Sequence, residues 1–183
     1  MKRINIHIGE YYSSAEPVVI STILGPCVSV CLYDRGTGTG GMNHILLPGQ
    51  KTGSVSAGGS RYAMNAMELL INQMMKLGAD RYRLKAKVFG GAQIFSCMKQ
   101  ETAMGLKNIE MVVDFLKTEK IPIVNYNFGG YEPRRIFFYT GTGDVLLQKI
   151  KSSEARGEFE DLRKKIADIE KKINCNKSIF FLD

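Results

Sequence analysis

The feature that most constrains the fold of this chain is a pair of strand-like segments joined by a glycine-rich stretch. Residues Val28 to Asp34 alternate along the chain, Arg35 to Gly40 are rich in glycine, and Gly41 to Leu47 are again mostly apolar. A period of two indicates a β-strand with one buried face, and short glycine-containing connections between such strands are typical of hairpins. The sequence therefore predicts a β-hairpin near the N-terminus.

The hairpin carries a cysteine at its mouth and a histidine on its second strand. Cys27 follows Gly25-Pro26, which breaks the preceding strand, and His44 lies in the second apolar run. A free thiol is mostly protonated at neutral pH, and an imidazole is the side chain best suited to accept its proton. Functional residues also concentrate at the ends of elements. Cys27 and His44 are therefore predicted to be a nucleophile and its base.

The length of the hairpin loop decides how these two residues are placed, and the sequence allows two registers. A tight turn at Arg35-Gly36 puts Cys27 directly opposite His44. A loop over residues 35–40 instead pairs Cys27 with Pro48 and moves His44 roughly 13 Å along the strand. Both registers leave Cys27 and His44 on one face of the hairpin, so a shared face is predicted and contact is left open.

The rest of the chain alternates between strand and helix patterns. Further strands are predicted over Ile4 to Ile8, Val18 to Ile23, Arg83 to Phe89, Pro122 to Tyr126, Arg135 to Tyr139 and Val145 to Ile150. One helix is predicted from Ala63 to Leu77, with Ser60 as its N-cap and Gly78 as its terminator, and a second from Ile109 to Leu116. These elements predict an α/β (α+β) layered sandwich, with a mixed β-sheet, an N-terminal hairpin and packed helices.

Length and composition predict one domain over residues 1–183, because 183 residues with 44% hydrophobic content can bury a sizeable core. Apolar residues recur every three or four positions around residues 154–173, which predicts a C-terminal amphipathic helix. Packing on its own domain is the expected role of this helix. Binding to a partner is the alternative.

The sequence argues against a secreted, membrane-spanning, metal-binding or nucleic-acid-binding protein. No segment resembles a signal peptide or is long enough to cross a bilayer, so we expect a cytoplasmic protein without membrane insertion. The four cysteines are expected to be reduced, and their spacing does not suit a metal site. Although the net charge is +7, basic and acidic residues are interleaved, which favours protein over nucleic acid as the partner. The glycine-rich stretch lacks a P-loop lysine, so no cofactor is expected.

Two of these segments resemble the chemoreceptor glutamine deamidases of the CheD family. They are Leu24 to Asp34 and Gly41 to Pro48. Lys87 to Ala92 resembles the family's strand and glycine turn, Gly105 to Asn108 resembles a helix start, and Ile121 to Arg135 completes the pattern. The resemblance covers about residues 1 to 150 and implies a layered sandwich.

The resemblance implies that the protein hydrolyses selected glutamine side-chain amides in methyl-accepting chemotaxis receptors to glutamate and ammonia. Cys27 would attack the carboxamide to form a thioester, and His44 would activate the thiol and protonate the departing ammonia. A third, hydroxyl-bearing residue would be Ser21 by ungapped position, with Thr22 as its nearest alternative. The CheC phosphatase is the further partner that the family suggests.

Two departures from the family pattern support an alternative function. Pro26 stands where the family usually has serine, which removes a hydroxyl and a backbone N–H, and Ser21 stands where threonine is common. The alternative is a non-catalytic regulatory module that binds chemoreceptors or CheC. Cysteine-dependent hydrolysis of another amide or ester is also open, because thioester chemistry alone does not select glutamine.

Overall fold

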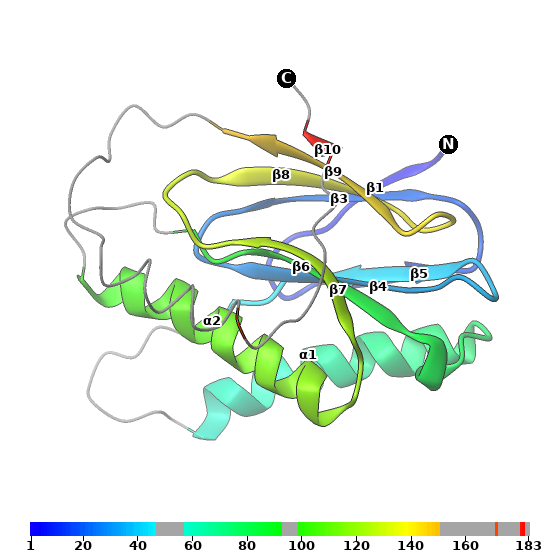
Figure 1. Ribbon diagram of the computed structural model, residues 1–183, viewed down its shortest axis with the longest axis horizontal. Coiled ribbons are helices and arrows are strands. Elements are labelled where there is room, and N and C mark those ends of the chain that lie inside the picture. Colours follow the sequence, from blue (N-terminus) through cyan, green and yellow to red (C-terminus); the bar gives the residue numbers. More distant parts are fainter. Residues whose placement is uncertain (47–56, 93–98, 151–170, 172–179, 182–183) are drawn as a thin grey trace.

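The computed structural model describes residues 1–46, 57–92, 99–150, 171 and 180–181. They form two five-stranded sheets stacked face to face, with two helices on the outer side of one sheet (Figure 1). The first sheet has the order β1-β3-β8-β9-β10, with β1 Arg3–Asn5, β3 Val19–Leu24, β8 Arg134–Tyr139, β9 Asp144–Lys149 and β10 Phe180–Phe181. The second has the order β2-β5-β4-β6-β7, with β2 Tyr11–Ser14, β5 Thr39–Asn43, β4 Val28–Asp34, β6 Lys85–Gly90 and β7 Ile123–Phe128.

Both sheets mix parallel and antiparallel pairs. β1 runs parallel to β3, β9 to β10 and β6 to β7, whereas the other neighbours are antiparallel. The helices, α1 Ala57–Lys76 and α2 Lys99–Thr118, cover the second sheet. The predicted α+β layered sandwich with mixed pairing is therefore confirmed, with two sheets in place of one.

The second sheet is the middle layer, so its strands are buried on both faces. Every residue of β4 is buried. Val28, Val30 and Leu32 pack toward the helices, and Cys31 and Tyr33 pack toward the first sheet. A strand covered on both sides needs apolar residues at successive positions, which explains the density of apolar residues in this segment.

The predicted strands all overlap observed ones, and β4 matches its predicted bounds. β2 was not predicted, because its four residues are half-buried or exposed and lack an alternating pattern. Ser60 is not an N-cap, since α1 begins at Ala57; the glycines at 58 and 59 are poor helix formers and suggested a later start. Gly78 follows the helix end as predicted, at a φ of +94°.

The hairpin is confirmed, but both predicted registers are wrong. Asp34 pairs with Thr39 and Cys31 with Met42, so the loop consists of residues 35–38 and the register lies midway between the two alternatives. The Asp34 carboxylate accepts the Gly36 N–H at 2.8 Å, and Gly38 adopts a φ of +70°. These local interactions stabilise a four-residue loop, a length that neither prediction considered.

Two glycines lie in β5, where neighbouring layers approach closely: Gly40, which was expected in the turn, and Gly41, which was expected to begin the strand. A Cβ on Gly40 would lie 2.7 Å from Cα of Thr140, which directly follows β8 of the first sheet. A Cβ on Gly41 would lie 2.7 Å from Cδ1 of Leu70 in α1. The middle layer therefore needs glycine here for packing rather than for turn geometry.

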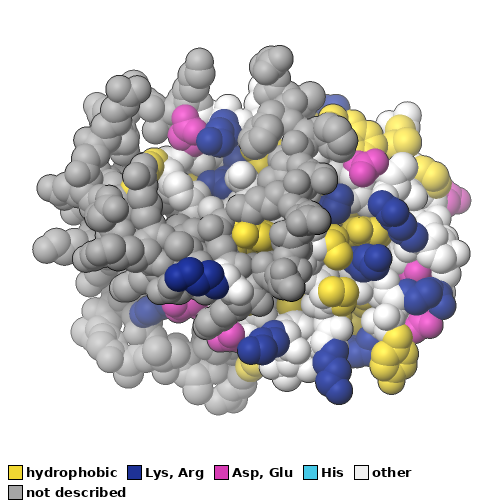
Figure 2. Space-filling view, in the orientation of Figure 1, with side chains coloured by type: hydrophobic (Ala, Val, Ile, Leu, Met, Phe, Trp, Pro, Cys, Tyr) yellow, Lys and Arg dark blue, Asp and Glu magenta, His cyan; other side chains and the backbone are white. Residues whose placement is uncertain are grey.

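The described residues show neither a single basic patch in Figure 2 nor a helix suited to cross a membrane. On the face shown in Figure 2, Lys and Arg side chains are spread among apolar and acidic ones and do not merge into one basic patch. Neither α1 nor α2 has the length and apolar content required of a membrane-crossing helix. The amphipathic helix predicted over 154–173 lies outside the described residues, apart from Lys171, which is helical.

Candidate active site

The backbone of His44 is fixed from two sides. Its N–H donates to the Glu10 carbonyl at 2.9 Å, and its carbonyl accepts the Gly9 N–H at 2.8 Å. The next residue, Ile45, exchanges two hydrogen bonds with Val28 of β4, at 2.9 and 2.8 Å. His44 is therefore held rigidly between β4 and the segment that leads into β2. Because it alternates with Met42, its side chain enters the space between the sheets.

The orientation and tautomer of the His44 ring follow from its contact with Thr22 of β3. Thr22 Oγ1 lies 2.8 Å from His44 Nδ1 and also 2.8 Å from the carbonyl oxygen of Ile6. A carbonyl only accepts, so the single hydroxyl proton goes to Ile6, and Oγ1 must accept a proton from Nδ1. The imidazole therefore carries its proton on Nδ1 and a lone pair on Nε2.

The Nε2 atom of His44 is buried and has no hydrogen-bond partner. Burial is the main reason that the pKa of His44 falls to about 4, with a smaller contribution from the nearby His7. At neutral pH the ring is therefore uncharged, with a free lone pair on the atom that faces away from Thr22. A neutral imidazole in this tautomer is a proton acceptor.

Cys27 lies on the same face of the hairpin as His44, as predicted from strand parity. The observed register places Ser29 opposite His44, so Cys27 is its diagonal neighbour. Diagonal pairs lie about 7–8 Å apart between Cα atoms, which is within reach of a long side chain. The thiol and the ring are not hydrogen-bonded in this structure, since Nε2 is unpartnered. Catalytic hydrogen bonds often tighten only when substrate is bound.

Burial also determines the resting state of the thiol. Cys27 is 5% exposed, and its desolvation raises the pKa of the thiol to about 11, although its own backbone N–H lowers that pKa somewhat. The resting pair is therefore a neutral thiol and a neutral imidazole. Such a pair needs proton transfer during the reaction rather than a preformed thiolate.

The structure brings Thr22, and not Ser21, to His44. Neighbouring residues of β3 point to opposite faces, and Thr22 shares the inner face with the buried Ile20 and Leu24. Ser21 points to the outer face, where its hydroxyl donates to Asn5 Oδ1. Counting back from Cys27 selected Ser21, whereas the alternation of Ile20, Thr22 and Leu24 was the signal that identifies the inner residue.

The turn that presents Cys27 is braced by the glycine turn after β6, a contact that the sequence did not reveal. The Gly91 N–H donates to the Cys27 carbonyl at 2.6 Å, and the Ala92 N–H donates to the Gly25 carbonyl at 2.7 Å. From α2, the Asn108 side chain donates to the Pro26 carbonyl at 3.1 Å. All three carbonyls of Gly25-Pro26-Cys27 are therefore held by neighbouring elements.

A helix start at Gly105 was expected and is wrong, because α2 begins at Lys99. Gly105 instead allows α2 to approach the glycine turn, since a Cβ there would lie 2.9 Å from the Gly91 carbonyl oxygen. This close approach is what brings Asn108 to Pro26. The two glycine motifs thus act together on the cysteine turn.

We expect Gly90→Ala to disturb this turn more than any nearby glycine substitution. Gly90 has a φ of +112°, and a Cβ there would lie 2.1 Å from the Cys27 carbonyl oxygen. We expect a loss of roughly 2–4 kcal/mol in the free energy of unfolding, measured by urea denaturation.

The matched control is Gly38→Ala, which also places alanine at positive φ but meets nothing within 4 Å. We expect Gly38→Ala to lose only about 1 kcal/mol in the free energy of unfolding, which is the cost of holding alanine at positive φ. Equal losses in the two variants would show that Gly90 does not contact the cysteine turn as described.

A pocket of about 650 Å³ lies beside this site, and we call it the Arg3–Arg135 pocket after two of its lining residues. Thr22 and His44 also line it, together with exposed residues of β1, β3 and β8. The pocket therefore borders the Thr22–His44 pair, whose side chains are themselves buried, and Cys27 is not among the residues that line it.

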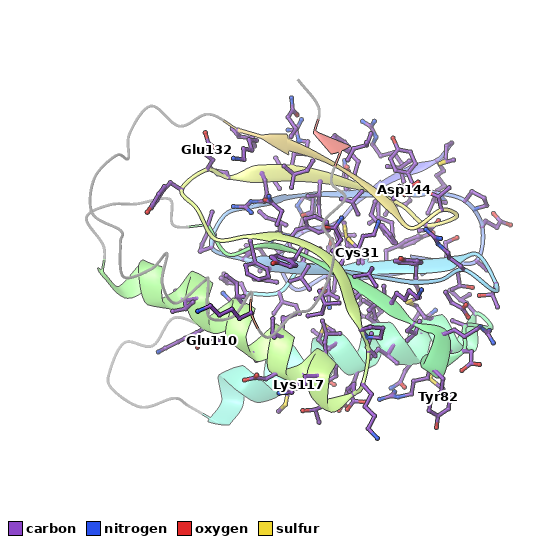
Figure 3. The ribbon with its side chains drawn as sticks, viewed as in Figure 1. Cys31, Tyr82, Glu110, Lys117, Glu132 and Asp144 are labelled. Atoms are coloured by element: carbon purple, nitrogen blue, oxygen red, sulfur yellow. The ribbon has the colours of Figure 1, made fainter. Side chains whose placement is uncertain are left out.

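The remaining described cysteine and metal-ligating residues do not form a second candidate site of this kind. Among those residues, no cluster of three or more His, Cys, Asp or Glu is arranged to hold a metal ion. The second described cysteine, Cys31, lies between the sheets (Figure 3), and burial raises its pKa far above the ordinary range. Cys97 and Cys175 lie outside the described residues.

A buried thiol, a neutral imidazole on the same face and a hydroxyl that orients the imidazole form a set of groups typical of cysteine-dependent hydrolases. Comparison with known proteins identifies the family. A family model described as CheD, chemotactic sensory transduction, matches residues 46–149, more than half of the chain. The chain belongs to the CheD family.

Curated relatives agree with this assignment. A probable chemoreceptor glutamine deamidase CheD of Thiobacillus denitrificans is 44% identical over 148 residues, covering 78% of this chain and 71% of the relative. Probable chemoreceptor glutamine deamidases CheD 1 of Dechloromonas aromatica and Shewanella oneidensis are each 42% identical, covering 78% and 79% of this chain and 70% of each relative. Among solved structures, the hypothetical protein YfiH of Bacillus licheniformis matches with a TM-score of 0.37 and 14% identity, over 66% of this chain and 49% of that one, which is too distant to bear on function.

Proposed function

We propose that this protein is a cysteine-dependent glutamine deamidase that converts selected glutamine side chains of methyl-accepting chemotaxis receptors to glutamate, with release of ammonia. The observation that carries the chemistry is the hydrogen bond from His44 Nδ1–H to Thr22 Oγ1, which leaves Nε2 as the proton acceptor beside the Cys27 face. The names of the relatives support the substrate.

In the first half of the proposed reaction, His44 Nε2 takes the Cys27 thiol proton as Sγ attacks the carboxamide carbon. The resulting tetrahedral oxyanion is stabilised by the Cys27 backbone N–H, which already interacts with its own sulfur. The imidazolium then protonates the amide nitrogen, the C–N bond breaks, and ammonia leaves a thioester on Cys27.

In the second half, water replaces ammonia. Nε2 takes a proton from water as its oxygen attacks the thioester carbon, and the C–S bond breaks to release glutamate. The proton held by His44 returns to the sulfur. No cofactor or metal is needed, and atoms and charge balance over the two halves.

Pro26 removes one backbone N–H that the family pattern would place beside the oxyanion. The Pro26 carbonyl nevertheless receives the Asn108 side chain, which fixes the direction of the Cys27 N–H that follows it. In this proposal the oxyanion relies on the Cys27 amide rather than on a donor from residue 26.

The pH dependence of the reaction follows from the neutral resting pair. Because the pKa of His44 lies at about 4 and that of Cys27 at about 11, both groups keep their reactive protonation states across neutral pH. We expect kcat/KM to stay level from about pH 6 to about pH 9 and to fall only at more acid pH, as His44 gains a proton and can no longer accept one. Initial rates of ammonia release over this range measure it, and an acid limb near the ordinary histidine value of about 6.5 would contradict a buried, neutral base.

The direct test of the function is to incubate the protein with the signalling fragments of chemoreceptors from the same source and to map the products by peptide mass spectrometry. We expect particular glutamines to become glutamate. Glutamines that remain intact at enzyme concentrations equal to those of the receptor would refute the activity.

One observation favours the alternative, a non-catalytic module that binds chemoreceptors or the CheC phosphatase. The thiol of Cys27 is protonated at rest and lacks a hydrogen bond to His44. Such a module would bind receptor fragments equally well with Cys27 or with alanine and would leave every glutamine unchanged. CheC as a partner rests on the family resemblance, and the cytoplasm as the location stays a prediction from the sequence.

A further inference from the structure

The Arg3–Arg135 pocket has an apolar floor between two guanidinium groups. Ile23 of β3 is 49% exposed there, and Phe137 of β8 lies beside it. The Arg3 guanidinium carbon sits 5.0 Å from the centre of the Phe137 ring, a cation–π distance, and Arg135 pairs with Ile23 across the β3–β8 ladder. The outer face of the first sheet therefore presents apolar surface with a positive charge on each side.

Among the residues that the structure describes, no acidic side chain lines this pocket. Its lining contains Arg3, Arg135 and His7. In the described ranges of the chain, neither Arg3 nor Arg135 belongs to an ion pair, whereas Arg81 and Arg83 each do. Exposed guanidinium groups that form no ion pair are available to bind a carboxylate from another molecule.

The pocket also joins the candidate active site, because Thr22 and His44 belong to its lining. Ile23, Phe137 and Arg135 lie on the outer face of the first sheet and Thr22 on its inner face, so a chain segment comes close to the imidazole where the pocket reaches Thr22 and His44. The occupant is then most naturally the substrate itself, at residues next to the glutamine that reacts.

We propose that this pocket selects the target glutamine by binding an acidic side chain near it on the receptor, with Arg3 and Arg135 holding the carboxylate and Ile23 and Phe137 packing against apolar side chains of the same helix. The inference rests on the proposed function, since it assigns specificity to that site. Because the pocket presents positive charge beside apolar side chains, the segment that it binds should be acidic and amphipathic. Neighbouring side chains three or four residues apart share one face of such a helix.

The test compares two receptor-derived peptides that differ only beside the target glutamine, one with glutamate and one with alanine. We expect the protein to prefer the glutamate peptide by about 5- to 20-fold in kcat/KM, through KM rather than kcat. Arg3→Glu and Arg135→Glu should each reduce this preference, and the double variant should remove it.

The control is Lys117→Glu, which makes the same change of charge on an exposed residue of α2, on the far side of the second sheet (Figure 3). It should keep the preference. A preference that survives in the double variant, or that falls equally in Lys117→Glu, would overturn the assignment and indicate a non-specific effect of net charge.

A binding measurement separates this inference from the proposed activity. In the Cys27→Ala protein, fluorescence anisotropy with labelled peptides reports binding without turnover. Tighter binding of the glutamate peptide that depends on Arg3 and Arg135 supports the pocket even if no deamidation is ever observed. Equal binding of both peptides refutes the pocket while leaving deamidation to be judged by mass spectrometry.

Discussion

Replacing Cys27 by alanine is expected to abolish receptor deamidation, with a fall in kcat/KM of roughly 10⁴-fold or more. The sulfur is the only atom proposed to form a covalent bond with the substrate, so no remaining group can form the thioester. The side chain is small and lies at a turn held by backbone hydrogen bonds to Gly91 and Ala92, so the fold should persist. Ammonia release and peptide mass spectrometry measure the loss, and circular dichroism verifies the fold.

Cys31→Ala is the matched control for this prediction. Cys31 is also a buried cysteine on the inner face of β4, four residues further along, and it packs in the core between the sheets. Its replacement should cost about 1 kcal/mol of stability and leave deamidation largely intact. Turnover that survives in Cys27→Ala, or disappears equally in Cys31→Ala, would contradict the role of Cys27.

Replacing His44 by alanine is expected to lower kcat by roughly 10²- to 10⁴-fold, because both halves of the reaction need its Nε2 as proton acceptor and donor. Within the described residues the buried ring forms no salt bridge, and its removal leaves Thr22 Oγ1 without its Nδ1–H donor. We therefore expect a folded protein with a much slower acylation step. Single-turnover kinetics on a receptor fragment measures that step.

The two hydroxyls before the cysteine turn provide a sharper comparison for the same mechanism. Thr22→Val removes the acceptor for Nδ1–H and should lower kcat by about 10- to 100-fold, whereas Thr22→Ser keeps the hydroxyl and should restore most of the rate. Ser21→Ala, on the opposite face of β3, should cost much less. The reverse order, with Ser21 more important than Thr22, would refute the assigned tautomer.

Strand parity was readable from the sequence because it depends only on local alternation. The period of two in Val28 to Asp34 correctly placed Cys27 and His44 on one face. The loop length was not readable, because the Asp34 side chain that shapes the loop is held by Arg83, 49 residues away. The local bond from the Gly36 N–H to Asp34 is thus supported by a distant residue, and that support leaves no trace in the spacing of the hairpin itself.

The contacts that hold the Gly25-Pro26-Cys27 turn also come from residues far away in the sequence. Asn108 reaches Pro26 across 82 residues, and only because Gly91 and Gly105 let α2 approach the turn. The sequence showed these motifs and their likeness to a family, but gave no reason why they should meet. Strand parity alone would have indicated that Thr22, and not Ser21, faces His44. The contact of Thr22 with the Ile6 carbonyl was not predictable from the sequence.

The most direct test of the mechanism is to trap the acyl-enzyme. The protein is mixed with a receptor peptide, quenched in acid during turnover and measured by intact mass spectrometry, with the modified residue located by digestion. We expect an adduct on Cys27 with the mass of the peptide less ammonia, which hydroxylamine removes and which is absent in Cys27→Ala. Deamidation that proceeds with no such adduct at any quench time, or with an adduct on another residue, would contradict a thioester on Cys27.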